Sequence, residues 1–196
     1  LEFRRVLFRS WRGLMLTKAV EQFLNDVHWG DLDYLVIDMP PGTGDIQMAL
    51  ARLLPQAEML VVTTPAKGAQ KVAARVADMA RRSYLKVLGV IENMSAFVAP
   101  DGSRHEIFGA GGGRRLAALT GAPLVGEIPI ESAVSTGGDD GTPVVIAEPT
   151  SPAARALRAV ADRIVDELLP PVEMAGCTAR MSELLAQLGT EPPASP

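Results

Sequence analysis

The sequence has little cysteine, no excess of basic charge and no long hydrophobic run. One cysteine among 196 residues excludes an internal disulfide framework and a structural zinc site built from several thiolates of one chain. Lysine and arginine number 19 against 23 aspartate and glutamate, so the basic footprint of a general nucleic-acid binder is absent. No apolar run approaches the roughly 18 residues that a membrane span requires. We therefore expect a cytoplasmic protein that binds neither nucleic acid nor membrane.

Apolar residues are plentiful by contrast. They make up 47% of the chain, against 21% charged residues, which is enough for the core of about one domain. The first ten residues, LEFRRVLFRS, are arginine-rich and resemble translated sequencing-adapter read-through, although a short basic helix or strand is the alternative. We treat residues 1–10 as foreign, residues 11–170 as a partial nucleotide-binding domain, and residues 171–196 as a C-terminal helix with a disordered tail.

Short apolar runs alternate with amphipathic segments along the chain. Strands buried on both faces are predicted around Leu35–Ile37 and over residues 58–64, 86–93 and 123–128, and helices over residues 14–27, 45–54, 67–82, 111–119 and 151–168. This alternation predicts an α/β fold with a mostly parallel sheet and helices on both faces. A hairpin is expected over residues 97–108, a polar loop over 132–141 and an edge segment over 143–147.

Ligands of such sheets bind beyond the carboxyl ends of the strands, so the residues there are candidates for chemistry. Asp38 ends the first predicted strand and precedes the proline- and glycine-rich turn MPPGTGD. A carboxylate at that place suits Mg²⁺ and the turn's amide groups suit a phosphate, although a surface turn capped by Asp38 is the alternative. Asn93 ends the third strand, where its amide can read a purine edge or simply serve a turn.

Other polar residues give weaker signals. Three glycines, residues 111–113, open a predicted helix and indicate either an anion site at its N-terminus or a flexible helix entry; no GxxxxGK[ST] phosphate loop is present. His28 and His105 lack metal-ligand spacing, and Cys177 is either a thiolate ligand or a small buried hydrophobe.

Six motifs together resemble one family. They are DMPPGTGD at residues 38–45, VVTTP at 61–65, VIENMS at 90–95, EIFGAGGG at 106–113, GEIPI at 126–130 and the GTPVV–SPAA segment at 141–154. In this order and spacing they resemble the Mrp/ApbC family of P-loop ATPases, relatives of MinD and the nitrogenase iron protein that carry iron–sulfur clusters. The resemblance extends over residues 11–168.

The resemblance implies roles for individual positions. Asp38 matches the Walker B aspartate, which orders Mg²⁺ through water, and Pro41, Gly42 and Thr43 match the switch II loop that senses the γ-phosphate of ATP. Asn93 matches the adenine-reading asparagine. The base pocket would be lined by Ile128, Pro129 and Ile130. The family also implies a homodimer, with iron–sulfur apoproteins or assembly factors as partners.

Two departures from the family pattern change what we expect. The glycine-rich loop that holds the β- and γ-phosphates, its strand and switch I do not occur in this sequence. The longer parent is expected to hydrolyse ATP, whereas this polypeptide should bind ATP weakly or not at all. Many members also carry a CxxC after the NMS motif, where this chain reads FVAPDG. A bridged [4Fe–4S] cluster is therefore in doubt, and Cys177 is the one thiolate left for iron–sulfur chemistry.

Two alternatives remain beside an iron–sulfur carrier. A MinD- or ParA-like positioning ATPase would carry a basic amphipathic C-terminal helix or a basic patch, and residues 177–188 hold one arginine and one glutamate. A non-catalytic scaffold without cluster binding is consistent with the missing CxxC.

Overall fold

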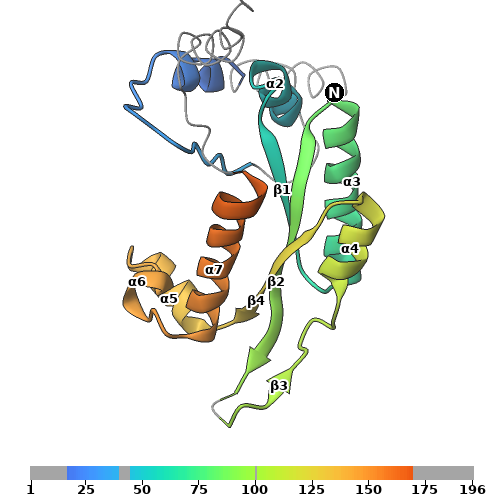
Figure 1. The fold of residues 1–196 in the computed structure, drawn as a ribbon, viewed down its shortest axis with the longest axis vertical. Coiled ribbons are helices and arrows are strands. Elements are labelled where there is room, and N and C mark those ends of the chain that lie inside the picture. Colours follow the sequence, from blue (N-terminus) through green and yellow to red (C-terminus); the bar gives the residue numbers. More distant parts are fainter. Residues whose placement is uncertain (1–16, 40–44, 100, 170–196) are drawn as a thin grey trace, which may run out of the picture.

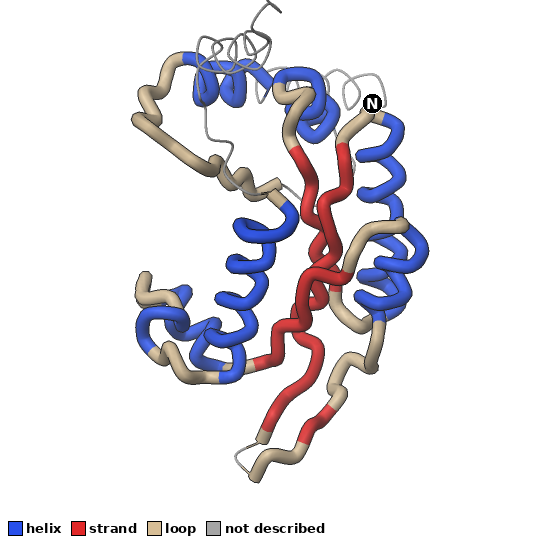
Figure 2. The backbone as a smooth tube through the Cα atoms, in the orientation of Figure 1, coloured by secondary structure: helices blue, strands red, loops and turns tan. Residues whose placement is uncertain are grey.

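The computed structural model describes residues 17–39, 45–99 and 101–169, and these contain a central sheet with helices against it (Figures 1 and 2). A helix over residues 17–25 comes first. It is followed by α2 (Asp45–Leu53), β1 (Glu58–Thr63), α3 (Lys67–Arg82), β2 (Lys86–Val98), β3 (Arg104–His105), α4 (Gly112–Thr120), β4 (Leu124–Ile130), α5 (Ser132–Asp139), α6 (Val144–Ala147), α7 (Pro152–Arg163) and a π-helical turn, η1 (Ile164–Leu168).

The long strand β2 organises the sheet. It pairs in parallel with β1 through Glu58↔Lys86 to Thr63↔Glu92, and in parallel with β4 through Val90↔Leu124 to Phe97↔Ile130. Its far end pairs antiparallel with β3, which completes the hairpin expected over residues 97–108. The two parallel ladders confirm the predicted α/β fold with a mostly parallel sheet.

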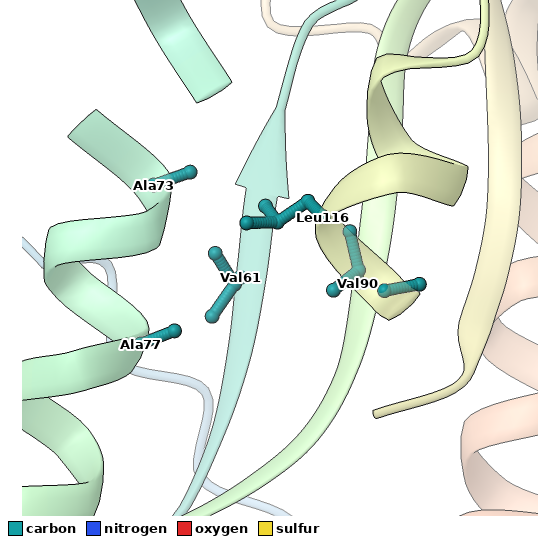
Figure 3. Packing of buried hydrophobic residues seen from close by; sticks show 6 residues of the cluster. Val61, Ala73, Ala77, Val90 and Leu116 are labelled. Carbon is teal, nitrogen blue, oxygen red and sulfur yellow. The ribbon is translucent and has the colours of Figure 1, made fainter. Parts of the chain in front are cut away.

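Each face of the sheet is covered by helices. On one face α3 and α4 bury Ala73, Ala77 and Leu116 against Val61 and Val90 (Figure 3). On the other face, Ala153 and Val160 of α7 pack against three aliphatic residues of β2 and β4. This second cluster consists of Ala153, Val160, Ile91, Val125 and Ile128. Helices on both faces were expected from the alternating pattern, and the two separate cores confirm it. Within the described ranges, no helix is long and apolar enough to cross a membrane.

Local sequence explains where the best-predicted helices begin and end. In α3 the alanines at 73, 77 and 80 are buried at helical spacing, and the predicted bounds 67–82 match. The last long helix, α7, begins after Ser151, whose side-chain oxygen accepts a hydrogen bond from the backbone amide of Ala154 at 3.2 Å, with Pro152 in the first turn.

The strand predicted around Leu35–Ile37 is not formed. This stretch belongs to no ladder of the described residues, and the exposed fractions of Leu35, Val36 and Ile37 are 43%, 91% and 39%. A strand requires a neighbour that completes its hydrogen bonds, and an apolar run alone does not supply one. The helix at residues 17–25 likewise leaves part of its apolar face uncovered at Phe23, which is 61% exposed.

The loop and edge segment predicted after β4 are also wrong, because α5 and α6 occupy them. Gly137 explains the tight connection between these helices. Its carbonyl oxygen accepts a hydrogen bond from the backbone amide of Thr142 at 2.8 Å, and a Cβ at Gly137 would lie 2.4 Å from the carbonyl oxygen of Thr142. Glycine permits this close approach of two backbone segments. In the sequence, the glycines of residues 132–141 had indicated a loop instead.

Candidate functional site

Neighbouring positions of β2 and β4 bring together the residues that the family resemblance assigns to the adenine site. Asn93 does not end its strand as expected, because β2 continues to Val98; it lies directly after Thr63↔Glu92, the last pair of the β1–β2 ladder. Asn93 and Ile128 are register partners in the parallel ladder between the two strands. Beyond them the register shifts, and pairing resumes at Phe97 and Ile130. Asn93 is half-buried and Ile128 is buried. The expected neighbourhood of Asn93 and residues 128–130 is therefore observed, whereas their role stays a prediction.

The backbone between the two paired stretches is irregular. Met94 has φ of 56°, a left-handed conformation that a non-glycine side chain seldom adopts. The Asn93 side chain stabilises it, because Oδ1 accepts a hydrogen bond from the Met94 amide at 2.8 Å. The amide NH₂ of Asn93 makes no hydrogen bond within the described residues. Tyr84, between α3 and β2, has a similar φ of 60°, so the feature gains meaning at Met94 only because it adjoins the residue that the resemblance assigns to adenine.

A buried carboxylate beside this site was missed by sequence reasoning. Glu92 is 2% exposed, and its Oε2 accepts a short hydrogen bond from the backbone amide of Gly113 in the first turn of α4. The positive end of the helix dipole favours a carboxylate there. Of the three glycines at 111–113, the amide of Gly113 is therefore bonded to Glu92 within the chain and is not open to an external anion. A single acidic residue inside an apolar strand was the signal that could have identified it.

The same glycines let α4 approach the end of β1 closely. A Cβ at Gly112 would lie 2.8 Å from Cα of Pro65 and 2.9 Å from the carbonyl oxygen of Thr64. At Gly113 it would lie 2.7 Å from Cβ of Glu92. The ends of β1, β2 and α4 are thus held in fixed contact around the segment that carries Asn93.

The residues that the resemblance assigns to Mg²⁺ and the phosphates are not gathered into a site by the described part of the chain. Asp38 lies outside the sheet and is exposed, with no ion pair or hydrogen bond to the described residues. Pro41, Gly42 and Thr43 lie outside the described residues, and so does Cys177. The structure therefore does not bring Asp38 and Asn93 together through any contact of the described chain.

The hairpin tip occupies the place where the resembling family often has its CxxC. Oδ1 of Asp101 accepts hydrogen bonds from the amide of Ser103 at 2.8 Å and from its hydroxyl at 2.6 Å. These two bonds hold the pKa of Asp101 below its ordinary value. The Ser103 hydroxyl also lies 3.0 Å from Nε2 of His105, whose ring stacks on Phe97. No group of three or more histidine, cysteine, aspartate or glutamate residues able to hold a metal exists in the described part of the chain.

Comparison with known proteins is consistent with this geometry. Curated iron–sulfur cluster carrier proteins of Mycobacterium leprae (strain TN) and Deinococcus radiodurans are 48% and 49% identical over 158 and 159 residues, which is 78% and 81% of this chain and 41% and 45% of theirs. The iron–sulfur cluster transfer protein NUBPL of Mus musculus is 41% identical over 160 residues, covering 81% of this chain and 50% of the mouse protein. The chain thus spans at most half the length of these relatives.

Solved structures agree on the fold. A nucleotide-binding protein of Archaeoglobus fulgidus, solved with ADP, superimposes with a TM-score of 0.61 at 34% identity, covering 71% of this chain and 56% of its own. The septum site-determining protein MinD of Pyrococcus horikoshii, at 23% identity and a TM-score of 0.57 over 79% and 57% of the two chains, shows the shared fold alone.

A family model described as ParA, the NUBPL iron-transfer P-loop NTPases, matches residues 8–165, which is most of the chain. On that match and the curated relatives, the chain belongs to the NUBPL-type family of iron-transfer P-loop NTPases.

Proposed function

We propose that this chain forms the base-binding side of the ATP site in a cytoplasmic, dimeric iron–sulfur cluster carrier. The observation that carries the proposal is the pairing of Asn93 with Ile128 in two parallel strands, directly beyond the point where the neighbouring β1–β2 ladder ends at Thr63↔Glu92. That is where ligands bind in open α/β sheets. The curated relatives, named as iron–sulfur cluster carriers, supply the functional class.

The chemistry of this pair fits an adenine ring. Oδ1 of Asn93 is engaged by the Met94 amide, so the NH₂ group is left as a donor toward a ring nitrogen. Because the hydrogen bond to Met94 fixes the plane of the Asn93 amide, the donor direction is set before a base arrives. Pro129 and Ile130 follow directly on the buried Ile128 and are half-buried, so apolar surface for a base lies beside that donor.

Other residues are assigned to the phosphates and to Mg²⁺. An exposed Asp38 with no competing partner in the described chain suits a carboxylate that holds Mg²⁺ through water. We assign Pro41, Gly42 and Thr43 to sensing the γ-phosphate, as their match to the switch II loop implies. Mg²⁺, when bound, neutralises charge on the β- and γ-phosphates. The printed sequence has no lysine-containing glycine-rich loop, so the 196-residue chain should bind the base with little help from the phosphates.

The iron–sulfur cluster is the cargo of such a carrier. A four-iron cluster takes four thiolates, and two copies of this chain supply two, both from Cys177. We propose that any cluster held by a homodimer is bridged by the two Cys177 thiolates and completed by ligands of an apoprotein or assembly factor. With a recipient apoprotein such an arrangement suits transfer, because half of the ligands then already belong to the recipient.

The base site can be tested on the chain as it stands. In a ¹⁵N-labelled sample, adenosine monophosphate should shift the amide resonances of residues 93–97 and 128–130, whereas guanosine monophosphate and inorganic triphosphate should not. Asn93→Ala should weaken the adenosine response about fivefold, because one hydrogen bond is worth about 1 kcal/mol. The matched control is Asn25→Ala, at an exposed asparagine at the end of the first helix. Equal responses to both nucleotides, or shifts elsewhere only, would refute the assignment.

A separate measurement tests the cargo. Reconstitution with iron and sulfide should give visible charge-transfer absorption in wild type that Cys177→Ala abolishes. Retention of the full absorption by Cys177→Ala would contradict the thiolate assignment while leaving the base site untouched.

A further inference from the structure

The outer surface of α3 and α4 is basic, although the chain as a whole is acidic. These two helices cover one face of the sheet (Figure 1) and together carry seven lysine and arginine residues and one acid, Asp78. The whole chain has 19 basic and 23 acidic residues. On the opposite face of the sheet α7 and η1 are balanced, with three arginines and three acids. An excess of positive charge is therefore concentrated on the α3–α4 surface.

Contacts within the chain leave most of this charge unpaired. Arg82 forms an exposed ion pair with Asp78 at 3.0 Å, and Arg114 pairs with Glu127 of β4 at 3.1 Å. The other five cations are exposed and make no ion pair with the described residues; they are Lys67, Lys71, Arg75, Arg81 and Arg115. Because like charges held on a folded surface repel one another, an anionic partner of the right shape is favoured there.

Three of the unpaired cations form a stripe along α3. Lys67, Lys71 and Arg75 are four residues apart, so they follow one another along one side of the helix with a rise of about 6 Å between neighbours. This side lies opposite the buried alanines of the helix. Further along the same side Asp78 and Arg82 neutralise each other, which ends the stripe.

The helix α4 widens this stripe, and an aliphatic side chain borders it. Arg115 of α4 donates a hydrogen bond to the side-chain oxygen of Gln70 in α3 at 3.3 Å. Because that acceptor is neutral, the bond holds the two helices side by side without cancelling the charge. Val72, the residue after Lys71, is 49% exposed. The surface therefore presents a row of cations with an apolar margin.

We propose that the α3–α4 surface binds an acidic helix of a partner protein. Its carboxylates lie at every fourth position, opposite Lys67, Lys71 and Arg75, and an aliphatic side chain of the same helix covers Val72. Carboxylates with that spacing repeat along a helix with the same rise as the cations. The charge pairs supply orientation and speed of association, and the apolar contact adds burial. The proposal depends neither on the base site nor on the cluster.

The extent of the charged surface favours a short polypeptide over a longer polyanion. The stripe spans about 12 Å, which is about two turns of a helix. The chain has a net charge of -4, so an extended nucleic acid or an anionic bilayer would also meet acidic surface. A row of phosphates, moreover, offers no aliphatic group to cover Val72.

The test uses the 196-residue chain and a peptide of four Glu-Leu-Ala-Ala repeats that carries fluorescein at its N-terminus. Fluorescence anisotropy should show saturable binding that weakens at least about tenfold when sodium chloride rises from about 0.05 M to about 0.5 M, because salt screens exposed pairs. The same peptide with glutamine for glutamate should not bind. A peptide of the same composition with its glutamates spread around the helix should bind at least about threefold more weakly. Equal binding by this rearranged peptide would overturn the match in spacing.

A pair of charge reversals locates the surface. Lys71→Glu should weaken peptide binding at least about fivefold, because a carboxylate then replaces the central cation of the stripe. The matched control is Lys18→Glu, which changes the net charge equally at an exposed lysine of the first helix and should bind as wild type does. Both lysines are exposed, so circular dichroism should show both variants folded.

Three outcomes would contradict the proposal. Equal weakening in the two variants would mean that the peptide responds to net charge alone. Tighter binding of a single-stranded oligonucleotide than of the peptide, lost in Lys71→Glu, would assign the surface to nucleic acid. The same result with vesicles that contain phosphatidylserine would assign it to a membrane.

Discussion

A methyl group added at Gly113 should destabilise the fold, although alanine is the better helix former. Gly113 is the second residue of α4, and an added Cβ would lie 2.7 Å from Cβ of Glu92 and 3.0 Å from Cδ1 of Leu124. Cβ of Glu92 cannot move away by changing rotamer. Ordinary contact begins at 3.4 Å, so helix and strand must separate by about 0.7 Å. This separation also stretches the hydrogen bond between the Gly113 amide and Glu92.

Overpacking of this kind costs about 1–3 kcal/mol, whereas alanine gains up to about 1 kcal/mol over glycine in a helix. Gly113→Ala should therefore lower the free energy of unfolding by about 1–2 kcal/mol. The matched control is Gly68→Ala, because Gly68 is the second residue of α3 and has no atom within 4 Å of the added Cβ. It should be neutral or stabilising by up to about 1 kcal/mol.

Urea denaturation followed by far-UV circular dichroism compares the two variants directly. Because the same substitution is made at the same helix position, propensity cancels and the difference reports packing against Glu92. If Gly113→Ala unfolds at the same or a higher urea concentration than Gly68→Ala, the close contact between α4 and β2 does not contribute as argued.

Three further outcomes follow from other contacts. Ser151→Ala should lower the unfolding free energy by about 1 kcal/mol in the same denaturation assay, because it removes the N-cap of α7. Arg82→Ala, which breaks an exposed ion pair with Asp78, should change that free energy by less than about 0.5 kcal/mol, since solvent screens the pair. The depressed pKa of Asp101 means that its contribution to the hairpin turn is present above the ordinary pKa of aspartate and is lost as pH falls through the lower folded value. The Ser103 amide resonance should shift over that range in wild type and not in Asp101→Asn.

Apolar runs and helical spacing predicted the parts of the fold whose packing partners lie within the described chain. The bounds of α3 follow from three alanines on one face, and β1 follows from a short apolar run between turns. The neighbourhood of Asn93 and Ile128 could also be predicted, because both follow apolar runs of parallel strands. The strand end expected at Asn93 was wrong, because β2 continues to Val98 and pairs there with β3. The left-handed backbone at Met94 could not be predicted, since methionine gives no indication of a positive φ.

Glu92 shows why a residue's type alone did not reveal its place. A carboxylate in an apolar strand is costly unless a partner is supplied, and the partner is a backbone amide 21 residues later in the chain. Only the docking of α4, which its first glycines permit, makes that amide available. The acid and the glycines are thus one feature, separated in sequence and joined by packing.

The unformed strand at Leu35–Ile37 and the unprotected edge of β1 have one explanation. The local sequence pattern predicts that both segments are buried strands. For β1 the prediction is correct along the edge that pairs with β2. For the other edge and for Leu35–Ile37, the described chain contains no partner, and Leu35–Ile37 remain exposed. Because strand formation depends on a neighbour, an apolar run predicts a strand only where the fold places a ladder partner beside it.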